Sequence, residues 1–464
     1  MLNYFPKYFS SRAVVTYFIT LISVSVIFMS HALPFQFMLF GIVPVCVFFS
    51  YANNLSMGWR HYSQKTFSKK LFLTALVIRL FYVLFIYVYY IQMTGRPNAY
   101  SPADELFYEY MGTLWKEFGF SETVQQMKQY ADLSDRGYCW WMSFETLLLG
   151  GHILPKRIVK CVLNAYSCVL MYKLAQRNFG EEAARMTGIF CMLMPNMWYY
   201  CGVSLKETEM VFLTILFAER TDFVLHSRKI NVVSLLLPAS CVLIMFTFRT
   251  ALAAVMFASM AAALIFTSSR QLNMGMKVFY VSIFAVWMMA TVGVEIVQET
   301  QQLWADRGEN QQVGYEWRAE TNSFAKYASA SVFAPLIFTI PFSSMVATPG
   351  QENQMMMNGA NFIKNVMSGL TIFALFVLLF SGDWRKHVLP IALTCGYLVV
   401  LVFSNFAHSE RFHFPVLAFE LMFAAYGVTQ LKNKHKRWFV MWLGFVCVAN
   451  IAWAWVKLKG RGII

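Results

Sequence analysis

Two adjacent carboxylates, Asp104 and Glu105, are the residues best suited by type and position to acid–base chemistry. They lie in a polar stretch, residues 101–116, just after a very apolar segment. Neighbouring side chains of a helix point about 100° apart, so one carboxylate can face a cavity while the other faces water or caps the helix. Acidic residues that follow a proline are also common in the first turn of a helix, because the helix dipole favours negative charge there. Spacing alone therefore leaves a purely structural role open.

Basic side chains expected near the same membrane surface strengthen the catalytic interpretation: Lys206, Arg249, Arg411 and His413, with His408 close by. Each has a structural alternative. Lys206 can pair with Glu207 or Glu209. Arg249 can reach lipid headgroups, and His413 can be an interfacial aromatic residue. We expect that together they form a cationic pocket opposite a carboxylate, which would suit a substrate with phosphate at its reacting end.

The elements that must position these residues are membrane-spanning helices. Of the 464 residues, 58% are hydrophobic and 13% are charged, and the apolar runs are about 17 to 22 residues long. Runs of this length cross about 30 Å of hydrocarbon as helices, whereas transmembrane strands are shorter and alternate. We therefore predict an all-α polytopic membrane protein. The net charge of +14 does not indicate a nucleic-acid partner, because Lys and Arg cluster in short loops.

We predict about 13 spans, near residues 13–30, 34–52, 71–92, 158–175, 186–202, 205–225, 231–248, 251–268, 276–294, 365–380, 388–404, 415–430 and 438–456. Alternate short loops carry the basic residues, which places the N-terminus in the cytoplasm. Residues 331–347 are apolar but contain two prolines, and a span there would turn the cluster Lys432–Arg437 outward. We expect a re-entrant or interfacial segment instead. The basic tail from Lys457 then lies outside, against the rule.

This topology divides the chain into three parts. Residues 1–70 form a transmembrane hairpin and a basic cytoplasmic loop. Residues 71–430 form the core, with outer loops at 93–157, 295–364 and 405–414, the first of which holds amphipathic, membrane-parallel helices. Residues 431–464 add a basic loop and the last helix.

The order of these features resembles the GT-C class of polyprenyl-phosphate-sugar-dependent glycosyltransferases, especially the protein O-mannosyltransferases and aminoarabinose transferases of the family-39 type. The resemblance is carried by Ile78-Arg79-Leu80 in an apolar helix, Ala103-Asp104-Glu105-Leu106 in the first outer loop, the aromatic stretch after Gly137, Arg157 to Ala165, Leu174 to Gly180, Pro195 to Tyr200 before Lys206-Glu207, Phe248-Arg249, and Glu410 to Pro415. The family's Arg-Pro step stands here as Arg249-Thr250.

The resemblance implies a donor phosphate held by Lys206, Arg249, Arg411 and His413. It implies Asp104 as the base for an acceptor hydroxyl, Glu105 as an orienting group, and inversion at the anomeric carbon. No metal or other cofactor is implied. The expected partners are a polyprenyl-phosphate-linked sugar, a glycan, lipid or protein acceptor, and membrane lipids. The expected location is the bacterial inner membrane, with the active site on its periplasmic or extracellular face.

Two other functions remain open. An O-antigen-type polymerase or ligase acting on a lipid-pyrophosphate-linked glycan would make Arg307, Arg318 and His408 central. A transporter or flippase would need charged or broken helices near the midplane and a repeated half. Only Arg79 lies deep in a predicted span and no repeat is evident, which disfavours transport.

Overall fold

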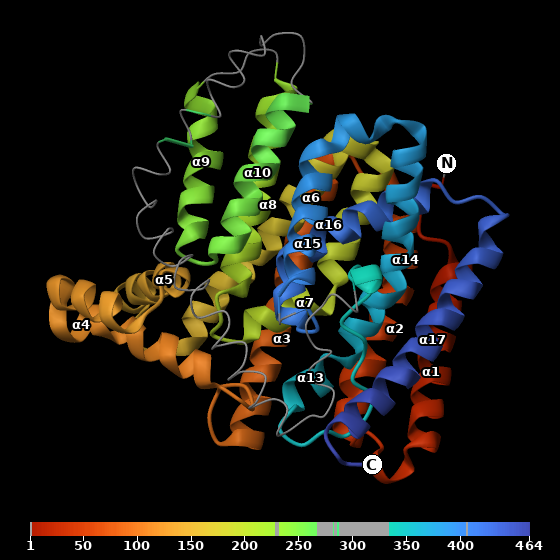
Figure 1. Cartoon of the computed structure of the whole chain (residues 1–464), viewed down its shortest axis with the longest axis horizontal. Coiled ribbons are helices and arrows are strands. Elements are labelled where there is room, and N and C mark those ends of the chain that lie inside the picture. The colour runs from red at the N-terminus through yellow and green to blue at the C-terminus, as the bar shows by residue number, and fades with distance from the viewer. Residues whose placement is uncertain (1, 228–231, 267–281, 283–284, 287–333, 405–406) are drawn as a thin grey trace.

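The computed structural model describes residues 2–227, 232–266, 282, 285–286, 334–404 and 407–464, and these ranges are helical apart from their connections (Figure 1). The α-helices are α1 (Lys7–Ile27), α2 (Phe35–Gly58), α3 (Gln64–Thr94), α4 (Ala103–Tyr130), α5 (Leu133–Leu149), α6 (Ile153–Leu193), α7 (Pro195–Tyr199), α8 (Glu207–His226), α9 (Val232–Phe246), α10 (Thr250–Phe266), α13 (Glu352–Met356), α14 (Asn358–Ser381), α15 (Val388–Val402), α16 (Glu410–Thr429) and α17 (His435–Gly460). Short 3₁₀ turns are η1 (Met29–His31), η2 (Trp59–His61), η3 (Tyr200–Gly202) and η6 (Asp383–His387).

The all-helical membrane architecture predicted from the sequence is confirmed. Eight helical segments of the described ranges are long and apolar enough to cross a membrane: α1, α2, α3, α6, α14, η6 with α15, α16 and α17. The helices α9 and α10 are apolar but shorter. α8 coincides with the predicted span 205–225 and carries several acidic residues. Most of the predicted span 276–294 lies outside the described residues, so the count of about 13 stays a prediction.

Helix α6 is folded back on itself at Gly180, whose φ of 83° and ψ of 175° are open to glycine alone. Cys168 and Cys191, on either side of this corner, both bond Arg79. The two arms of α6 are therefore antiparallel neighbours, and the corner falls between two predicted spans.

Arg79 joins these arms to α3. The side chain is fully buried, and its Nε donates to Asn164 Oδ1 at 2.7 Å. Other donors of the guanidinium reach the carbonyls of Ala75, at 3.0 Å, and Cys191, at 3.3 Å. Arg79 is therefore held within the bundle. Its buried charge is held by neutral acceptors from three segments.

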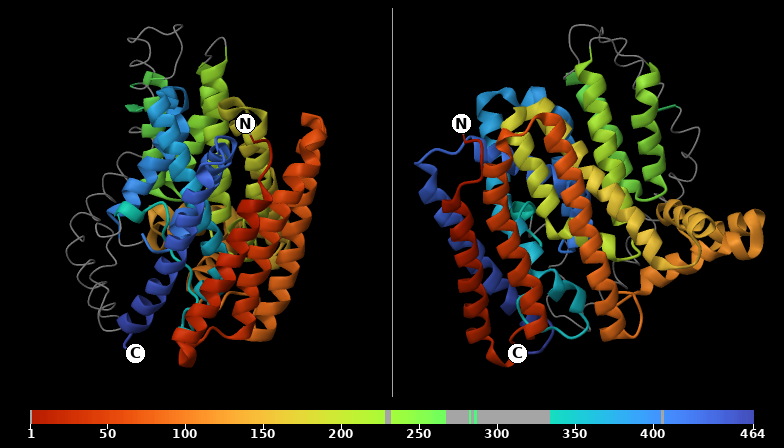
Figure 2. Two further views of the ribbon diagram at one scale, coloured as in Figure 1. Left: turned by 90° about the vertical axis from the view of Figure 1, so that its right-hand side faces the viewer. Right: turned by 180° about the vertical axis from the view of Figure 1, so that it is seen from behind.

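Several of the predicted basic loops lie together at one end of the bundle. Arg185, just after the corner of α6, donates to the carbonyls of Trp59, at 2.8 Å, and Tyr62, at 2.7 Å. His387, between α14 and α15, bonds Asn178 at 2.9 Å. These contacts agree with the alternation of basic loops, and Figure 2 shows the spanning helices running between the two ends. Which end faces the cytoplasm stays a prediction.

Residues 334–350 form an irregular, mostly buried segment at the opposite end. Asn365 donates to the carbonyls of Thr339, at 2.5 Å, and Pro341, at 2.9 Å. Asn450 of α17 accepts from the backbone of Ser343 at 2.6 Å. Irregular backbone at membrane depth needs such partners. This described part of the proline-containing segment is not a spanning helix.

Helices α4 and α5 run across the ends of the spanning helices rather than along them (Figure 1). They pack on each other, and Ser143 of α5 donates to the carbonyl of Met111 at 3.1 Å. A corner at Gly119, with φ 81° and ψ 173°, bends α4 as Gly180 bends α6.

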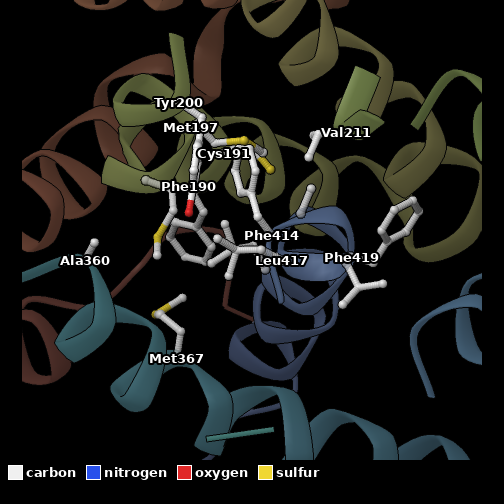
Figure 3. Close-up of a cluster of buried hydrophobic side chains, with 14 of the residues drawn as sticks. Phe190, Cys191, Met197, Tyr200, Val211, Ala360, Met367, Phe414, Leu417 and Phe419 are labelled. Carbon is white, nitrogen blue, oxygen red and sulfur yellow. The ribbon is translucent and has the colours of Figure 1, made fainter. Parts of the chain in front are cut away.

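Helix α16 lies in the centre of the bundle, and every side chain from His413 to Ala425 is buried. Figure 3 shows Phe414 and Leu417 among side chains of α6, η3 and α14. Phe414 stacks on Tyr200 with 4.6 Å between the ring centroids. Because such a core is close-packed, it holds the first turn of α16 in a fixed place.

Candidate functional site

A cavity of about 300 Å³ opens at the end of the bundle where α4, α13 and α16 begin. It is lined by Ala99, Ser101, Ala103, Asp104, Glu105, Tyr199, Tyr200, Val203, Leu205, Gly350, Gln351, Asn353, Gln354, Ser409, Glu410 and Arg411. Four of the chain's segments thus converge there, and two predicted site regions share one wall. We call it the polar cavity.

Asp104 is the accessible carboxylate of the predicted pair. It lies in the first turn of α4, its side chain is 54% exposed, and Arg411 Nη1 donates to its Oδ2. Pro102 precedes the helix without a side-chain cap. Asp104 therefore both places negative charge in the first turn of α4 and faces the polar cavity. A carboxylate in this position can accept a proton from a bound hydroxyl.

Glu105 is buried and fully engaged, with 2% of the residue exposed. Its two oxygens accept from the backbone of Ala99, at 3.0 Å, and Ser204, at 2.9 Å, and Arg157 lies 3.6 Å away. Burial raises the pKa of Glu105, and Arg157 opposes that shift. The carboxylate therefore ties the loop before α4 to the segment before α8 and to α6. That is a positioning role.

Arg411 links Asp104 to a second carboxylate that the sequence did not assign to it. Its Nε donates to Oε1 of Glu207, the first residue of α8, which is fully buried. Arg249 Nη2 lies 3.7 Å from the same oxygen, and Arg249 Nη1 donates to Tyr397 Oη at 3.2 Å. The result is a continuous line of alternating charges from Asp104 through Arg411 and Glu207 to Arg249.

Lys206 directly precedes Glu207 but pairs with neither Glu207 nor Glu209. Its Nζ donates to Asp135 Oδ1 at 2.5 Å and to the Ser134 carbonyl at 2.6 Å, both in α5. Burial, the largest single influence, disfavours the Asp135 carboxylate, but Lys206, Tyr108 and Arg411 together outweigh it and lower the pKa of Asp135 below its ordinary value. Lys206, Arg249 and Arg411 are therefore three cations grouped around Glu207, and we call them the cationic row.

His413 does not line the polar cavity. Only 1% of the residue is exposed, and its Nε2 lies 2.7 Å from the carbonyl of Ala407. A carbonyl only accepts, so Nε2 carries the proton and Nδ1 accepts from Lys364 Nζ at 2.8 Å. Both ring nitrogens are thus occupied inside the protein. The structure does not bring His413 to the polar cavity, and its contact with the donor phosphate stays a prediction.

Of the residues central to the alternative polymerase or ligase, Arg307 and Arg318 lie outside the described residues. His408 is described and is not among the side chains that line the polar cavity. Among the residues that the structure describes, no group of three or more His, Cys, Asp or Glu side chains could hold a metal ion. The expectation of a metal-independent reaction stays a prediction.

A second, mainly apolar cavity of about 430 Å³ lies between α5, α8 and α9. It is lined by Gly137, Trp140, Trp141, Phe144, Leu163, Glu209, Phe212, Leu213, Ile244, Thr247 and Phe248. Phe248 directly precedes Arg249, and Gly137 follows Asp135, the partner of Lys206. Of the cationic row, Arg411 lines the polar cavity, whereas the apolar cavity is lined by close sequence neighbours of Arg249 and Asp135.

Sequence reasoning missed three residues of this end of the bundle: Glu207, Asp135 and Lys457. Lys457 of α17 is buried and bonds Gln351 and Gln354 of the polar cavity. Its signal was present in the sequence as the basic residue that broke the charge rule. A buried, hydrogen-bonded lysine carries no information on orientation, so Lys457 drops out of the charge rule, whereas Lys459 of the same tail is exposed.

Comparison with known proteins gives one family match. Neither the curated proteins nor the solved structures contain a match to the chain. Residues 324–458, which include Arg411 and Lys457 but not Asp104, match the model of the Alg9-like mannosyltransferase family. This family is of the GT-C type, so the match confirms the predicted resemblance and supports a membrane glycosyltransferase that uses a lipid-linked sugar.

Proposed function

We propose that this protein is an integral membrane glycosyltransferase that moves a sugar from a polyprenyl-phosphate donor to an acceptor hydroxyl on the outer face of the membrane. The observation that carries the proposal is the cationic row itself: Arg411 and Arg249 meet at Glu207, Arg411 lines the polar cavity, and Phe248, next to Arg249, lines the apolar cavity. A lipid-phosphate sugar has the same order of parts: an apolar tail, an anion and a polyol. The match to a mannosyltransferase family supports the same reaction class.

The donor would bind with its first isoprene units in the apolar cavity, against Trp141, Phe212 and Phe248. Its phosphate would lie on the cationic row. In the structure each of these cations pairs with a carboxylate. Among the described residues, Arg411 bonds through Nε and Nη1, which leaves Nη2 for a phosphate oxygen. Guanidinium groups suit this exchange because they bind phosphate and carboxylate in the same geometry.

Asp104 would act as the base once the phosphate engages Arg411. Losing the ion pair with Arg411 makes the carboxylate a better proton acceptor, since a nearby positive charge stabilises its ionised form. The acceptor oxygen would bond to the anomeric carbon while the bond from that carbon to the lipid-phosphate oxygen breaks. The acceptor proton would pass to Asp104, and the lipid phosphate would leave on the cationic row. This single displacement inverts the anomeric centre.

The acceptor would enter through the polar cavity as the hydroxyl of a glycan, lipid or protein. The predicted topology places this cavity on the periplasmic or extracellular face, in a bacterial inner membrane. Positioned base catalysis contributes typically about 10² to 10⁴-fold, and the cations stabilise the charge of the departing phosphate.

The decisive experiment is transfer from a radiolabelled polyprenyl-phosphate sugar, with mannose first, by the purified protein in lipid nanodiscs. Membrane glycans of a strain that lacks the protein supply candidate acceptors, identified by mass spectrometry. Asp104→Asn should remove transfer, whereas Glu117→Gln, on an exposed part of α4, should not. Full transfer by Asp104→Asn would overturn the mechanism, and absence of transfer by the unaltered protein from every such donor would overturn the function.

A further inference from the structure

Lys457 occupies an unusual position for the last helix of a membrane protein. It is buried at the end of α17 that meets residues 343–354. Its Nζ donates to Ser344 Oγ at 2.8 Å, to Gln351 Oε1 at 3.0 Å and to Gln354 Oε1 at 2.7 Å. An ammonium group has three donors, and these three bonds use all of them.

The lysine dictates how both glutamine amides are turned. An ammonium only donates, so each amide must present its oxygen to Lys457 and direct its NH₂ group elsewhere. Both Gln351 and Gln354 line the polar cavity. Asn353 between them is turned in the same sense, because its Oδ1 accepts from the backbone of Tyr100 at 3.3 Å. One wall of the polar cavity thus carries amides whose oxygens are already occupied.

Acceptors line the polar cavity as well: the carboxyl groups of Asp104 and Glu410 belong to its lining, together with Tyr199, Tyr200 and Arg411. A sugar hydroxyl both donates and accepts, so a cavity lined by both amides and carboxyl groups matches a polyol.

We propose that Gln351 and Gln354, oriented by Lys457, form a subsite for the hydroxyl groups of a sugar. The inference rests on the proposed function and deepens it, because it names the part of the polar cavity that binds the hydroxyl groups of the sugar. Lys457 is a positioning residue, and the two glutamines contact the ligand. The last helix, outside the predicted core, thereby contributes to substrate choice.

Replacing each glutamine by glutamate separates this role from a structural one. Gln354→Glu keeps an oxygen on Lys457 and turns the contact into an ion pair, so folding is retained. The same change removes the NH₂ donor and adds a negative charge to the cavity. We expect the KM of one sugar substrate to rise roughly tenfold or more, with kcat changed far less, because a site that loses a hydrogen bond to a hydroxyl loses affinity. Gln351→Glu should act in the same direction.

Separate KM measurements for the donor and the acceptor show which substrate's sugar occupies the subsite. A raised KM for the acceptor assigns the subsite to the acceptor glycan, and a raised KM for the donor assigns it to the transferred sugar. Lys457→Met should raise the same KM because both amides lose their fixed orientation. Gln125→Glu, on an exposed part of α4, is the matched control and should change neither KM. Unchanged KM values for both glutamine variants would overturn the proposal.

A binding measurement keeps the subsite testable apart from catalysis. Saturation-transfer NMR with the methyl glycosides of mannose, glucose and galactose should detect contact with the unaltered protein and a loss of contact in Gln354→Glu. That pattern would support the subsite even if no transfer from polyprenyl-phosphate sugars were found. Equal signals for the two proteins, or no signal for either, would overturn it.

Discussion

Arg411 donates its Nε to Glu207, a carboxylate that is completely buried, and this pair connects the start of α16 to the start of α8. The same guanidinium reaches the half-exposed Asp104 through Nη1. The stability of the fold and the proposed transfer reaction therefore both depend on the side chain of Arg411. A substitution of Arg411 alone would confound the two, but a double substitution can separate them.

Arg411→Ala should destabilise the protein by on the order of 3 kcal/mol, because Glu207 would remain buried with Arg249 as its distant partner. Adding Glu207→Gln should restore much of the apparent Tm, since the uncompensated charge is gone. Transfer should stay low in both proteins, because the donor phosphate has lost its cation. Thermal unfolding in detergent and the transfer assay measure the two effects. Recovery of transfer along with Tm would show that Arg411 is structural only.

Substitution of Glu105 should cost more stability, and substitution of Asp104 should cost more activity. Glu105→Gln leaves one of two buried backbone donors, from Ala99 and Ser204, without an acceptor, at a cost of about 1 to 3 kcal/mol. Asp104→Asn affects an exposed ion pair and should cost about 1 kcal/mol or less. Its loss of rate should be about 10² to 10⁴-fold. A larger loss of Tm in Asp104→Asn than in Glu105→Gln would contradict this division of roles.

The helical architecture and the convergence of Asp104 with Arg411 could be predicted from the sequence, because apolar run length and basic loops determine spans and sides. The ion-pair partners of individual side chains could not be predicted in this way. Lys206 precedes α8 rather than lying in it, so the helical spacing rule that suggested Glu209 does not apply. Its partner Asp135 comes from α5, and only the tertiary fold brings them together.

His413 illustrates a second limit. Its neighbours in the sequence, Arg411 and Glu410, both line the polar cavity, and a surface role for His413 followed naturally. On a helix, however, residues two positions apart point to different faces. His413 therefore faces Lys364 of α14, and the burial of α16 on nearly all sides was not visible in its composition.

The corner of α6 supplies a prediction about folding. Gly180→Ala should cost about 1 to 3 kcal/mol, because its backbone conformation is strained for any residue with a Cβ. An added Cβ would meet no atom within 4 Å, so the cost is one of backbone alone. Gly444→Ala in α17 is the matched control, since it also meets no atom and has no positive φ. A comparable loss of Tm in both variants would indicate that the corner tolerates ordinary residues.

Glu145 of α5 predicts how stability depends on pH. Burial, aided by the nearby Glu209, raises the pKa of Glu145 to about 8, against an ordinary value of 4.5, although Lys160 and Lys156 oppose the shift. The folded protein thus holds a proton there that the unfolded chain releases between these two values. The stabilising contribution is complete below pH 4.5 and is lost as pH rises through about 8.

Glu145→Gln, which mimics the protonated form, should flatten the decline of apparent Tm between about pH 5 and 8 and give a higher Tm than the unaltered protein at pH 8. Burial also raises the pKa of Glu105, so some of the slope should remain. Asp135 does not contribute in this window, because its pKa is lowered from 3.8. The exposed Glu117→Gln is the control and should leave the slope unchanged. Parallel Tm curves for Glu145→Gln and the unaltered protein would show that Glu145 is ionised in the folded state, with Lys160 and Lys156 compensating its burial.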